Sequence, residues 1–342
     1  MLRGSIIGLG KIAQTGHLPA FGNEHISGLA ELVAGVDPKK ESREIAGRHF
    51  PQLRLYEHSL EMSENEKIDF VDICAPPQFH AELIESAIQH RVHILCEKPF
   101  VPSVRDADRI RDILRRSGHM LAFVPCHQYR YSPLWQHFKR FLDDTGSHAT
   151  SFLQFNVFRT GADPGLHSST KAWRTDPSIS GGGILADTGV HYLYLSLWMM
   201  GMPVKVAAHT GRLSHAPDGV EDTAIAVLDY GSSIVEINLT WAADKRANSA
   251  RIVNNRGSIV YDGARVTRAS GSSTEELPAP DASDKSHYVG MYVDLIREFV
   301  DRIQGSKSTS DWIEEAYRSI QLLHACYRAA ETGSTITVNH VT

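Results

Sequence analysis

Features that would assign this 342-residue chain to a specialised class of protein are scarce. Only four cysteines occur, at Cys74, Cys96, Cys126 and Cys326, and no two have the short spacing of a metal or redox site. No apolar run approaches the roughly 18 residues that cross a bilayer, and no signal peptide is evident. The net charge is −5 without a basic stripe, which argues against a nucleic-acid partner. We therefore expect a cytoplasmic protein with buried thiols and no membrane contact.

The rest of the composition, 42% hydrophobic and 22% charged residues, is that of an ordinary globular protein, and its length suggests two domains. Through about residue 125, apolar runs alternate with helical patterns, which is typical of βαβ units and a parallel sheet. Ser103 is placed to cap the third helix. We predict a Rossmann dinucleotide-binding domain over 1–126. Its expected strands are 5–8, 31–37, 68–74, 92–96 and 119–124, and its expected helices are 38–48, 78–90 and 103–117.

After residue 150, apolar and polar residues alternate, which predicts a second α/β domain over 127–342 with a large, open, mostly antiparallel sheet. The expected strands are 151–159, 204–212, 223–230, 233–241, 250–255 and 258–263. Helices are expected at about 287–304 and 309–331, and a loop at 270–286, which is rich in Ser, Pro and acids. A partly apolar open sheet is a large surface for a monomer, so we expect a homodimer or homotetramer through 204–263.

The first strand leads into GLGKIA (8–13), which fits the G-x-G-x-x-A pattern. Gly8 permits a tight turn, Gly10 lets the main chain approach a pyrophosphate, and Ala13 allows a helix to pack closely on the sheet. Because the pattern stands between a strand and a helix, we favour a cofactor site over a simple turn. The predicted cofactor contacts here are Gly8, Gly10, Lys11, Ile12 and Ala13.

Asp37 ends the second expected strand, where an acid accepts hydrogen bonds from the adenosine ribose and repels a 2′-phosphate. It lies 29 residues after Gly8, and a longer loop accounts for the excess over the usual spacing of about 20. The acid favours NAD, while Lys39 and Lys40 leave NADP as the alternative. The alternative role for Asp37 is a helix cap before Pro38.

Two loops follow strands at the same edge of the sheet, where ligands bind in doubly wound folds. Pro76 and His80 lie in the first, which we interpret as support for the nicotinamide ribose, with a rigid turn as the alternative. Glu97 and Lys98 lie in the second, as part of Glu-Lys-Pro. Lys98 there reaches the ribose and a substrate hydroxyl, and a cis bond to the proline would aim it. A surface lysine before a turn is the alternative.

The segment GGGILADTGVH (181–191) places Asp187 and His191 four residues apart, so that on a helix they share a face. The three glycines leave room for a ligand. A lysine, a carboxylate and a histidine can move a proton while a cofactor carries a hydride, which predicts Lys98, Asp187 and His191 as the catalytic set. A capping Asp with a core histidine is the alternative. A metal pair would need a third ligand, and we predict no metal.

Trp173 and Arg174 fit a polyol site, because an indole stacks on a sugar ring and a guanidinium binds hydroxyl, carboxylate or phosphate groups. A core tryptophan beside a surface arginine is the alternative.

With these residues in view, the chain resembles the Gfo/Idh/MocA family, named for glucose–fructose oxidoreductase, inositol 2-dehydrogenase and MocA. The matching segments, in the family's order, are GLGKIA (8–13), APPQFH (75–80), CEKPF (96–100), YRYSP (129–133), WR (173–174) and GGGILADTGVH (181–191). The resemblance implies a Rossmann domain followed by an open-faced α/β domain that often mediates dimers or tetramers. It implies His191 as the acid/base. The implied substrate contacts are Lys98, Arg130, Tyr131, Trp173, Arg174, Asp187 and His191. Many members carry Asp where this chain has Tyr194.

These features predict an NAD(H)-dependent oxidoreductase that transfers a hydride to or from a secondary alcohol or ketone of a sugar, cyclitol or related polyol. His191 would take the hydroxyl proton, Lys98 would hold the hydroxyl, and Asp187 would orient His191. One alternative keeps NAD tightly bound and recycles it in a net epimerisation or elimination. Another is a regulatory protein that binds the dinucleotide without turnover, for which the catalytic set would be superfluous.

Overall fold

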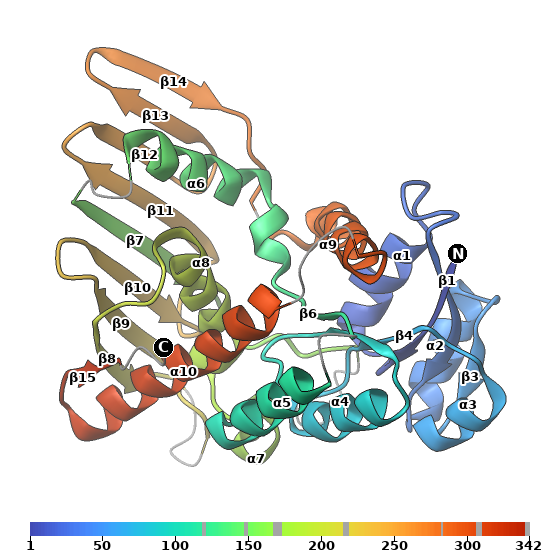
Figure 1. The fold of residues 1–342 in the computed structure, drawn as a ribbon. Helices are drawn as coiled ribbons and strands as arrows, with labels where there is room; N and C mark the ends of the chain where they lie inside the picture. Colours follow the sequence, from blue (N-terminus) through green and yellow to red (C-terminus); the bar gives the residue numbers. More distant parts are fainter. Residues whose placement is uncertain are drawn as a thin grey trace. The chain divides into compact units, whose positions relative to one another are not determined.

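The structure, a computed structural model, describes residues 1–117, 121–146, 150–166, 173–214, 219–281, 283–305 and 310–338 (Figure 1). The chain divides into two compact units. Unit 1 holds residues 1–128, 165–169 and 283–317, and unit 2 holds residues 129–164, 170–282 and 318–342. A single boundary after residue 126 is expected from the sequence. The division differs because helix α9 (Tyr288–Ile303) packs on α1 (Leu18–Phe21) of unit 1.

Unit 1 is built on a six-stranded parallel sheet with the order β3-β2-β1-β4-β5-β6. The strands are β1 (Leu2–Ile7), β2 (Ala30–Val36), β3 (Arg54–Tyr56), β4 (Phe70–Ile73), β5 (His93–Cys96) and β6 (Phe123–Pro125). The central strand β4 is buried at every position, which explains why its residues are apolar except for Asp72. The predicted Rossmann sheet is confirmed. Edge strand β3 is absent from the predicted strands because it has only three, incompletely buried residues. Positions 119 and 120 of the last predicted strand lie outside the described residues.

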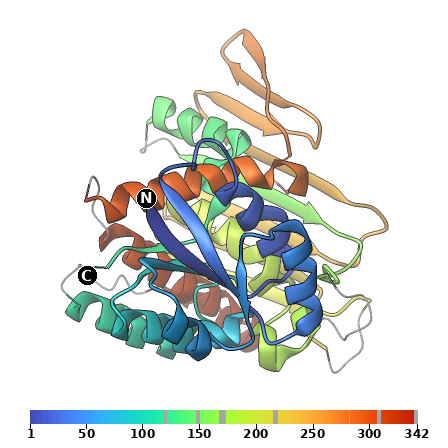
Figure 2. The same cartoon turned by 90° about the vertical axis from the view of Figure 1, so that its right-hand side faces the viewer.

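Helices cover both faces of this sheet, with α1 and α9 on one face and α4 and α5 on the other (Figures 1 and 2). The remaining helices are α2 (Lys40–His49), α3 (Ser59–Asn65), α4 (His80–Gln89) and α5 (Val104–Arg116), with a π-helix at Ala13–His17 and 3-10 turns at Pro77–Phe79 and Lys285–His287. As predicted, Ser103 caps α5, because its hydroxyl accepts the Asp106 N–H at 3.1 Å.

Unit 2 contains a nine-stranded sheet with the order β14-β13-β12-β11-β7-β10-β9-β8-β15. The strands are β7 (Ser151–Phe158), β8 (Lys205–Gly211), β9 (Thr223–Asp229), β10 (Ile234–Thr240), β11 (Ala247–Asn254), β12 (Gly257–Tyr261), β13 (Val266–Ser270), β14 (Ser273–Leu277) and β15 (Ile336–Thr337). Among the described strand pairs of this nine-stranded sheet, only β7 and β10 run parallel, so the predicted mostly antiparallel sheet is confirmed.

The expected loop at 270–286 is wrong in part. β14 lies inside this stretch and pairs with β13 across a turn at Gly271, which has a φ of +59°. β14 is an edge strand whose side chains are mostly exposed. It therefore has no buried face. Because no face is buried, its sequence lacks the alternation of apolar and polar residues that predicts a strand.

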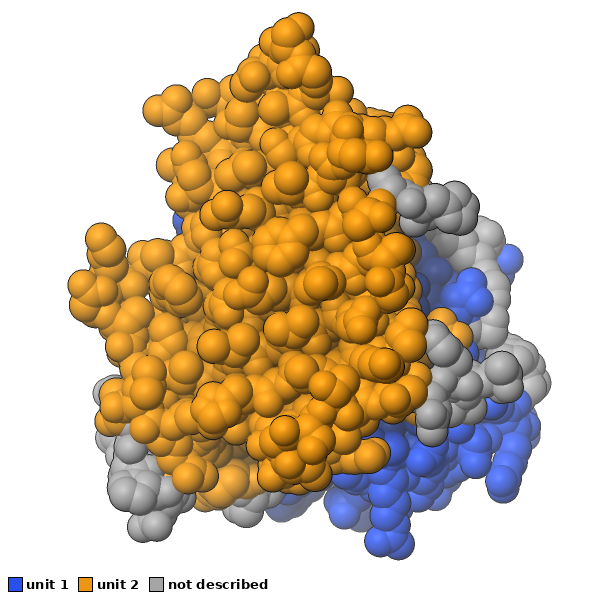
Figure 3. Space-filling view, turned by 90° about the vertical axis from the view of Figure 1, so that its left-hand side faces the viewer, with its two compact units in different colours: residues 1–128, 165–169, 283–317 blue, residues 129–164, 170–282, 318–342 orange. Residues whose placement is uncertain are grey.

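The helices of unit 2 lie on one face of its sheet (Figure 1). They are α6 (Pro133–Thr145), α7 (Pro177–Ser180), α8 (Val190–Met200) and the part of α10 (Ser310–Thr332) from residue 318 onward, with a π-helix at Leu185–Gly189 and a 3-10 turn at Trp173–Thr175. Figure 3 shows unit 2 from the left-hand side of Figure 1. Exposed apolar side chains on the strands of this sheet include Phe152, Phe158, Ile225, Ile234 and Val253. Within the described parts of the chain, no helix combines the length and apolarity that a membrane span needs.

Candidate active site

The carboxyl ends of the central strands of unit 1 lie side by side. Ile7 of β1 pairs in register with Val36 of β2 and with Ile73 of β4, and Ile73 pairs with Cys96 of β5. The segments that follow these strands are therefore neighbours at the edge where doubly wound sheets bind ligands. All the predicted cofactor residues lie in these segments.

Gly8 and Gly10 meet different requirements in the turn after β1. Gly8 has a φ of +95°, and a Cβ there would lie 2.5–2.8 Å from main-chain atoms of Cys74 and Ala75. A Cβ on Gly10 would meet no other described heavy atom within 4 Å, so its main chain is open to an incoming group. Ala13 is fully buried at the start of the π-helix. This turn fits the pyrophosphate of a dinucleotide.

Asp37 ties the end of β2 to the glycine turn. Its carboxylate accepts the Leu9 N–H at 2.9 Å and the Lys39 N–H at 2.8 Å. Nearby, Arg43 donates to the Asp37 carbonyl oxygen at 2.6 Å and to Glu57 at 3.2 Å. Because the Arg43 guanidinium is already engaged and an acid follows β2, this end of the strand suits a ribose hydroxyl better than a 2′-phosphate.

His80 joins the two loops that follow β4 and β5. Its ring nitrogens lie 2.7 Å from the Ala75 carbonyl oxygen and 3.0 Å from that of Pro99. The ring is fully buried, and this burial lowers the pKa of His80 below its ordinary value. His80 thus supports the loops from inside, whereas Pro76 is partly exposed. A direct contact of either residue with the cofactor stays a prediction.

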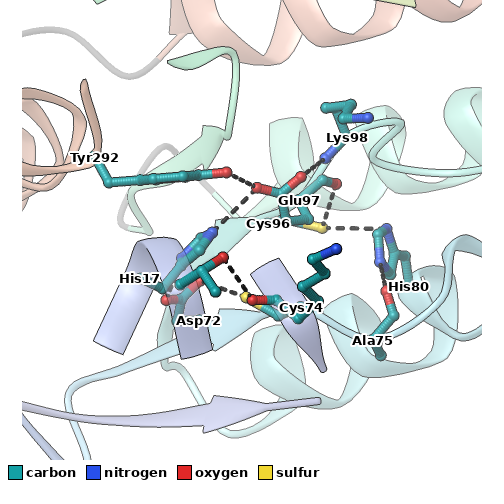
Figure 4. A network of polar contacts seen from close by, with 11 residues as sticks. His17, Asp72, Cys74, Ala75, His80, Cys96, Glu97, Lys98 and Tyr292 are labelled. Atoms are coloured by element: carbon teal, nitrogen blue, oxygen red, sulfur yellow. Dashed lines mark hydrogen bonds and ion pairs between the residues drawn. The ribbon is translucent and has the colours of Figure 1, made fainter. Parts of the chain in front are cut away.

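Glu97 is the centre of a buried polar network (Figure 4). Its Oε1 accepts the hydroxyl of Tyr292 from α9 at 2.5 Å and lies 3.1 Å from Nε2 of His17. Nδ1 of His17 lies 2.7 Å from Oδ2 of Asp72 on β4. The Lys98 N–H donates to Oε2 of Glu97 at 3.1 Å. Four segments that are distant in sequence therefore meet behind the Glu-Lys-Pro loop.

Opposite charges stabilise the ionised forms in this network. Burial disfavours a charged imidazole, but the charge and hydrogen bond of Asp72 raise the pKa of His17 well above its ordinary value. Burial likewise disfavours an ionised Glu97, yet the hydrogen bond and charge of His17 bring the pKa of Glu97 below its ordinary range. Both shifts favour the charged forms of His17 and Glu97, which face each other at 3.1 Å.

Cys74 and Cys126 lie beside the network, so it contains the residue types of a metal site. Both ring nitrogens of His17 already face carboxylates. Burial raises the pKa of both thiols. In the structure, His17, Asp72 and Glu97 form a hydrogen-bonded network beside them.

Lys98 follows Glu97 directly, and its peptide bond to Pro99 is cis. Figure 4 shows the lysine side chain pointing away from the buried network. The main chain of Lys98 is therefore held from inside the unit, at the sheet edge that carries the glycine turn.

Asp187 and His191 lie in unit 2, on consecutive helical segments. Asp187 belongs to the π-helix Leu185–Gly189, and His191 to the first turn of α8. Arg174 donates from Nε to Oδ1 of Asp187 at 3.1 Å, and its guanidinium lies 4.4 Å from the ring centre of Trp173. The structure thus brings together three residues that the sequence predicts as substrate contacts. Short π-helical segments are frequent at functional sites.

His191 is buried and stacks on Tyr129, with ring centres 4.2 Å apart and an angle of 16° between the rings. Arg130 and Tyr131, in the turn before α6, are partly buried. Arg130 donates to the hydroxyl of Tyr194 at 3.2 Å. Tyr194 therefore serves as a hydrogen-bond partner of a predicted substrate residue.

The glycines before the π-helix make room for protein atoms. A Cβ on Gly182 would lie 2.0 Å from the Tyr327 hydroxyl oxygen, and one on Gly183 would lie 1.9 Å from the Glu221 carbonyl oxygen. The Glu221 carboxylate accepts the N–H groups of Gly183 at 2.8 Å and Leu185 at 3.1 Å, and Tyr327 donates to it at 2.8 Å. The expectation that these glycines leave room for a ligand is wrong for positions 182 and 183, because Glu221 and Tyr327 fill that space.

Sequence reasoning misses the residues that hold the predicted site in place. They are His17, Asp72, Glu221, Tyr292 and Tyr327. Asp72 carries a readable signal, since an acid in the middle of an apolar strand needs a buried partner. The two tyrosines carry none, because each lies in an ordinary amphipathic helix and bonds a carboxylate 195 or 106 positions away.

Comparisons with known proteins agree with this geometry. Residues 2–124 match the family described as "Oxidoreductase family, NAD-binding Rossmann fold", and residues 151–260 match the GFO/IDH/MocA C-terminal domain. The chain is 24% identical to D-glucoside 3-dehydrogenase of Escherichia coli K12 over 98% of this chain and 97% of that protein. It is 31% identical to D-apiose dehydrogenase of Paraburkholderia graminis over 69% of this chain and 59% of that protein.

A solved oxidoreductase from Agrobacterium radiobacter, in complex with NAD+, L-tartaric acid and magnesium, has the same fold, with a TM-score of 0.83 and 21% identity over 98% of each chain. Both halves of the chain thus match one family, and the glycine turn of unit 1 fits the cofactor of that family. The chain belongs to the GFO/IDH/MocA family of NAD-binding oxidoreductases.

Proposed function

We propose that this NAD-dependent oxidoreductase transfers a hydride to or from a secondary alcohol or ketone of a sugar, cyclitol or related polyol. The observation that carries the proposal is Lys98 at the same sheet edge as the open main chain of Gly10. In unit 2, the indole of Trp173 and the guanidinium of Arg174 beside Asp187 suit a polyhydroxylated ring. The relatives named as D-glucoside and D-apiose dehydrogenases support this substrate class.

NAD, when bound, accepts or returns the hydride. The turn after β1 would hold its pyrophosphate, and Asp37 its adenosine ribose. The loops after β4 and β5 would hold the nicotinamide end. The proposed contacts are Gly8, Gly10, Lys11, Ile12, Ala13, Asp37, Pro76, His80, Glu97 and Lys98.

The protein residues handle the proton and the substrate oxygen. His191 takes the hydroxyl proton during oxidation and returns it during reduction. Lys98 holds the hydroxyl and offsets the negative charge that develops on its oxygen. Asp187, fixed by Arg174, orients His191 and contacts a substrate hydroxyl. Arg130 and Tyr131 contribute further substrate contacts.

The test mixes the protein with NAD and a panel of alkyl glucosides, pentoses and inositols, and follows absorbance of the reduced nicotinamide. We expect reduction with at least one polyol, and none with the Lys98→Ala variant. A protein that binds NAD but reduces none of it with any polyol would contradict the proposal and favour a binding or recycling role.

We propose that the outward face of the unit 2 sheet forms a homodimer or homotetramer. Its exposed Phe152, Ile234 and Val253 pair directly across three strands, which makes one contiguous apolar patch. Ile234→Glu should dissociate the assembly, whereas Leu60→Glu, on exposed α3, should leave it intact. Light scattering of the wild type and both variants measures this, and a monomeric wild type would contradict it.

We also propose a cytoplasmic location. All four cysteines are buried free thiols, which fits a reducing compartment. Fractionation of cells that express the protein tests this, and recovery in an oxidising compartment would contradict it.

A further inference from the structure

The lysine proposed to hold the substrate hydroxyl is anchored through its neighbour. The Glu97 carboxylate receives three hydrogen bonds, from His17, from Tyr292 and from the main-chain N–H of Lys98 (Figure 4). The two side chains bond Oε1, and the Lys98 N–H bonds Oε2. Because bonds to one oxygen determine where the other points, His17 and Tyr292 set the position of the acceptor for Lys98.

His17 is itself fixed at its second ring nitrogen. Nδ1 lies 2.7 Å from Asp72 on the central strand β4, so the ring cannot turn without losing contacts with two carboxylates. His17 and Asp72 are 0% exposed and Glu97 is 6% exposed. Water therefore has little access to replace a bond that is lost, so the loss of any one bond in the network is costly.

Tyr292 completes the network from a helix near the other end of the chain. Its ring centre lies 4.1 Å from that of His17. Gly16 provides the space, since a Cβ there would lie 2.7 Å from Cε2 of Tyr292. The tilted ring contact and the hydroxyl bond to Glu97 together place α9 against the Glu-Lys-Pro loop of the same unit.

Stability alone explains this arrangement poorly. Buried ionic groups give little net stabilisation compared with apolar residues of similar shape, but they do impose direction. Here the oriented group is the Glu97 carboxylate, which accepts the main-chain N–H of Lys98. We infer that His17 and Tyr292 are positioning residues for Lys98, acting through the carboxylate of Glu97. This inference rests on the proposed role of Lys98.

The first measurement is hydrogen exchange at the Lys98 amide, which reports the bond to Glu97 without any substrate. Tyr292→Phe removes only the hydroxyl and should accelerate exchange about tenfold, the scale of one lost hydrogen bond to a charged group. His17→Gln, the second variant, should act in the same direction. Tyr317→Phe is the matched control, because its hydroxyl donates to Asp108 at 2.7 Å elsewhere in unit 1. Its Lys98 exchange should equal that of the wild type.

The second measurement separates kcat from KM. Tyr292→Phe should lower kcat about 10- to 100-fold, because a displacement of about 1 Å near the reacting groups can cost that much. NAD affinity should stay near the wild-type value, and the Tyr317→Phe control should keep its kcat. A role in stability alone would lower the unfolding temperature and leave kcat unchanged.

The inference is overturned if Lys98 exchange in Tyr292→Phe equals that of the wild type, or if exchange accelerates while kcat stays normal. A wild-type protein that turns over no polyol would instead refute the proposed function. The exchange experiment would still decide whether His17 and Tyr292 hold Lys98.

Discussion

Each unit fixes a functional segment with a carboxylate that a tyrosine from a late helix holds. In unit 1, Tyr292 of α9 donates to Glu97, the neighbour of Lys98. In unit 2, Tyr327 of α10 donates to Glu221, which bonds the N-terminal N–H groups of the π-helix that carries Asp187. The same kind of bond, from a tyrosine hydroxyl to a carboxylate, therefore occurs in two units with different folds.

The charges around the two carboxylates differ. Glu97 faces the His17 ring, whose pKa is raised, whereas Glu221 faces main-chain N–H groups at a helix start, where an anion is favoured. Burial, followed by the charge of the facing carboxylate, raises the pKa of both Tyr292 and Tyr327 well above the ordinary value, so both remain donors. A buried carboxylate can thus be stabilised by a charged side chain or by a helix terminus. Only when the partner is a titrating side chain does the stabilisation of the carboxylate depend on the protonation of a second group.

The largest expected effect comes from removing one functional side chain in each unit. Lys98→Ala and His191→Ala should each lower kcat about 10²- to 10⁴-fold, the range for a positioned proton-transfer group. NAD affinity should change little, because the turn after β1 binds the phosphates. Steady-state kinetics and NAD titration measure both quantities. Near-normal kcat in both variants would end the proposed mechanism.

Loss of the unit 2 carboxylate should have a smaller effect. Glu221→Ala leaves two N–H groups without their acceptor, which should lower the free energy of unfolding by about 1–3 kcal/mol and reduce kcat. Tyr327→Phe is the matched control, since it keeps both of these bonds and should lose less. Urea unfolding and kcat measure the difference. Equal losses in the two variants would show that the tyrosine, and not the helix start, determines the position of Glu221.

The pH dependence of stability should distinguish the two carboxylates. The raised pKa of His17 stabilises the fold below its ordinary value of 6.5, and this contribution is lost as the pH rises through the folded pKa. The lowered pKa of Glu97 stabilises the fold above its ordinary value of 4.5, and this contribution is lost as the pH falls through the folded pKa. The difference in unfolding free energy between wild type and His17→Gln should therefore be largest between these values.

Denaturant unfolding of wild type and His17→Gln across this range is the measurement. The same experiment on Glu221→Gln serves as the control, because no histidine bonds that carboxylate among its described partners. A wild-type advantage over His17→Gln that grows toward alkaline pH would contradict an imidazolium at this position.

The smallest effect concerns the adenosine end of unit 1, which should act independently of the Glu97 network. The wild type should bind NAD more tightly than NADP. Asp37→Ala should reduce the ratio of the two affinities about tenfold, because an anion that accepts hydrogen bonds from the ribose is lost. Lys39→Ala should leave the preference nearly unchanged. Titration of both cofactors measures this, and tighter NADP binding by the wild type would refute the role of Asp37.

Local patterns predict much of this fold because they record burial. The mostly apolar, buried segments of β4 and β5 can be recognised in the sequence for that reason, and so can the cap at Ser103. The hairpin of β13 and β14 is not, since β14 buries no face. The sequence predicts both the glycine turn after β1 and its role in binding the cofactor. The glycines at 182 and 183 are also visible in the sequence, but the reason for them is not, because the atoms that leave no room for a side chain belong to the distant residues Glu221 and Tyr327.

By itself, the sequence determines the parallel and antiparallel halves, the cofactor class, and Lys98, Asp187 and His191 as the candidate catalytic residues. Only the tertiary structure decides which polar side chains meet behind them, with His17 and Tyr292 converging on Glu97. The physical reason is that periodicity reports which face of an element is buried and not which residue lies opposite. That pairing depends on how distant elements pack, and α9 joins the first strands only when the chain has folded.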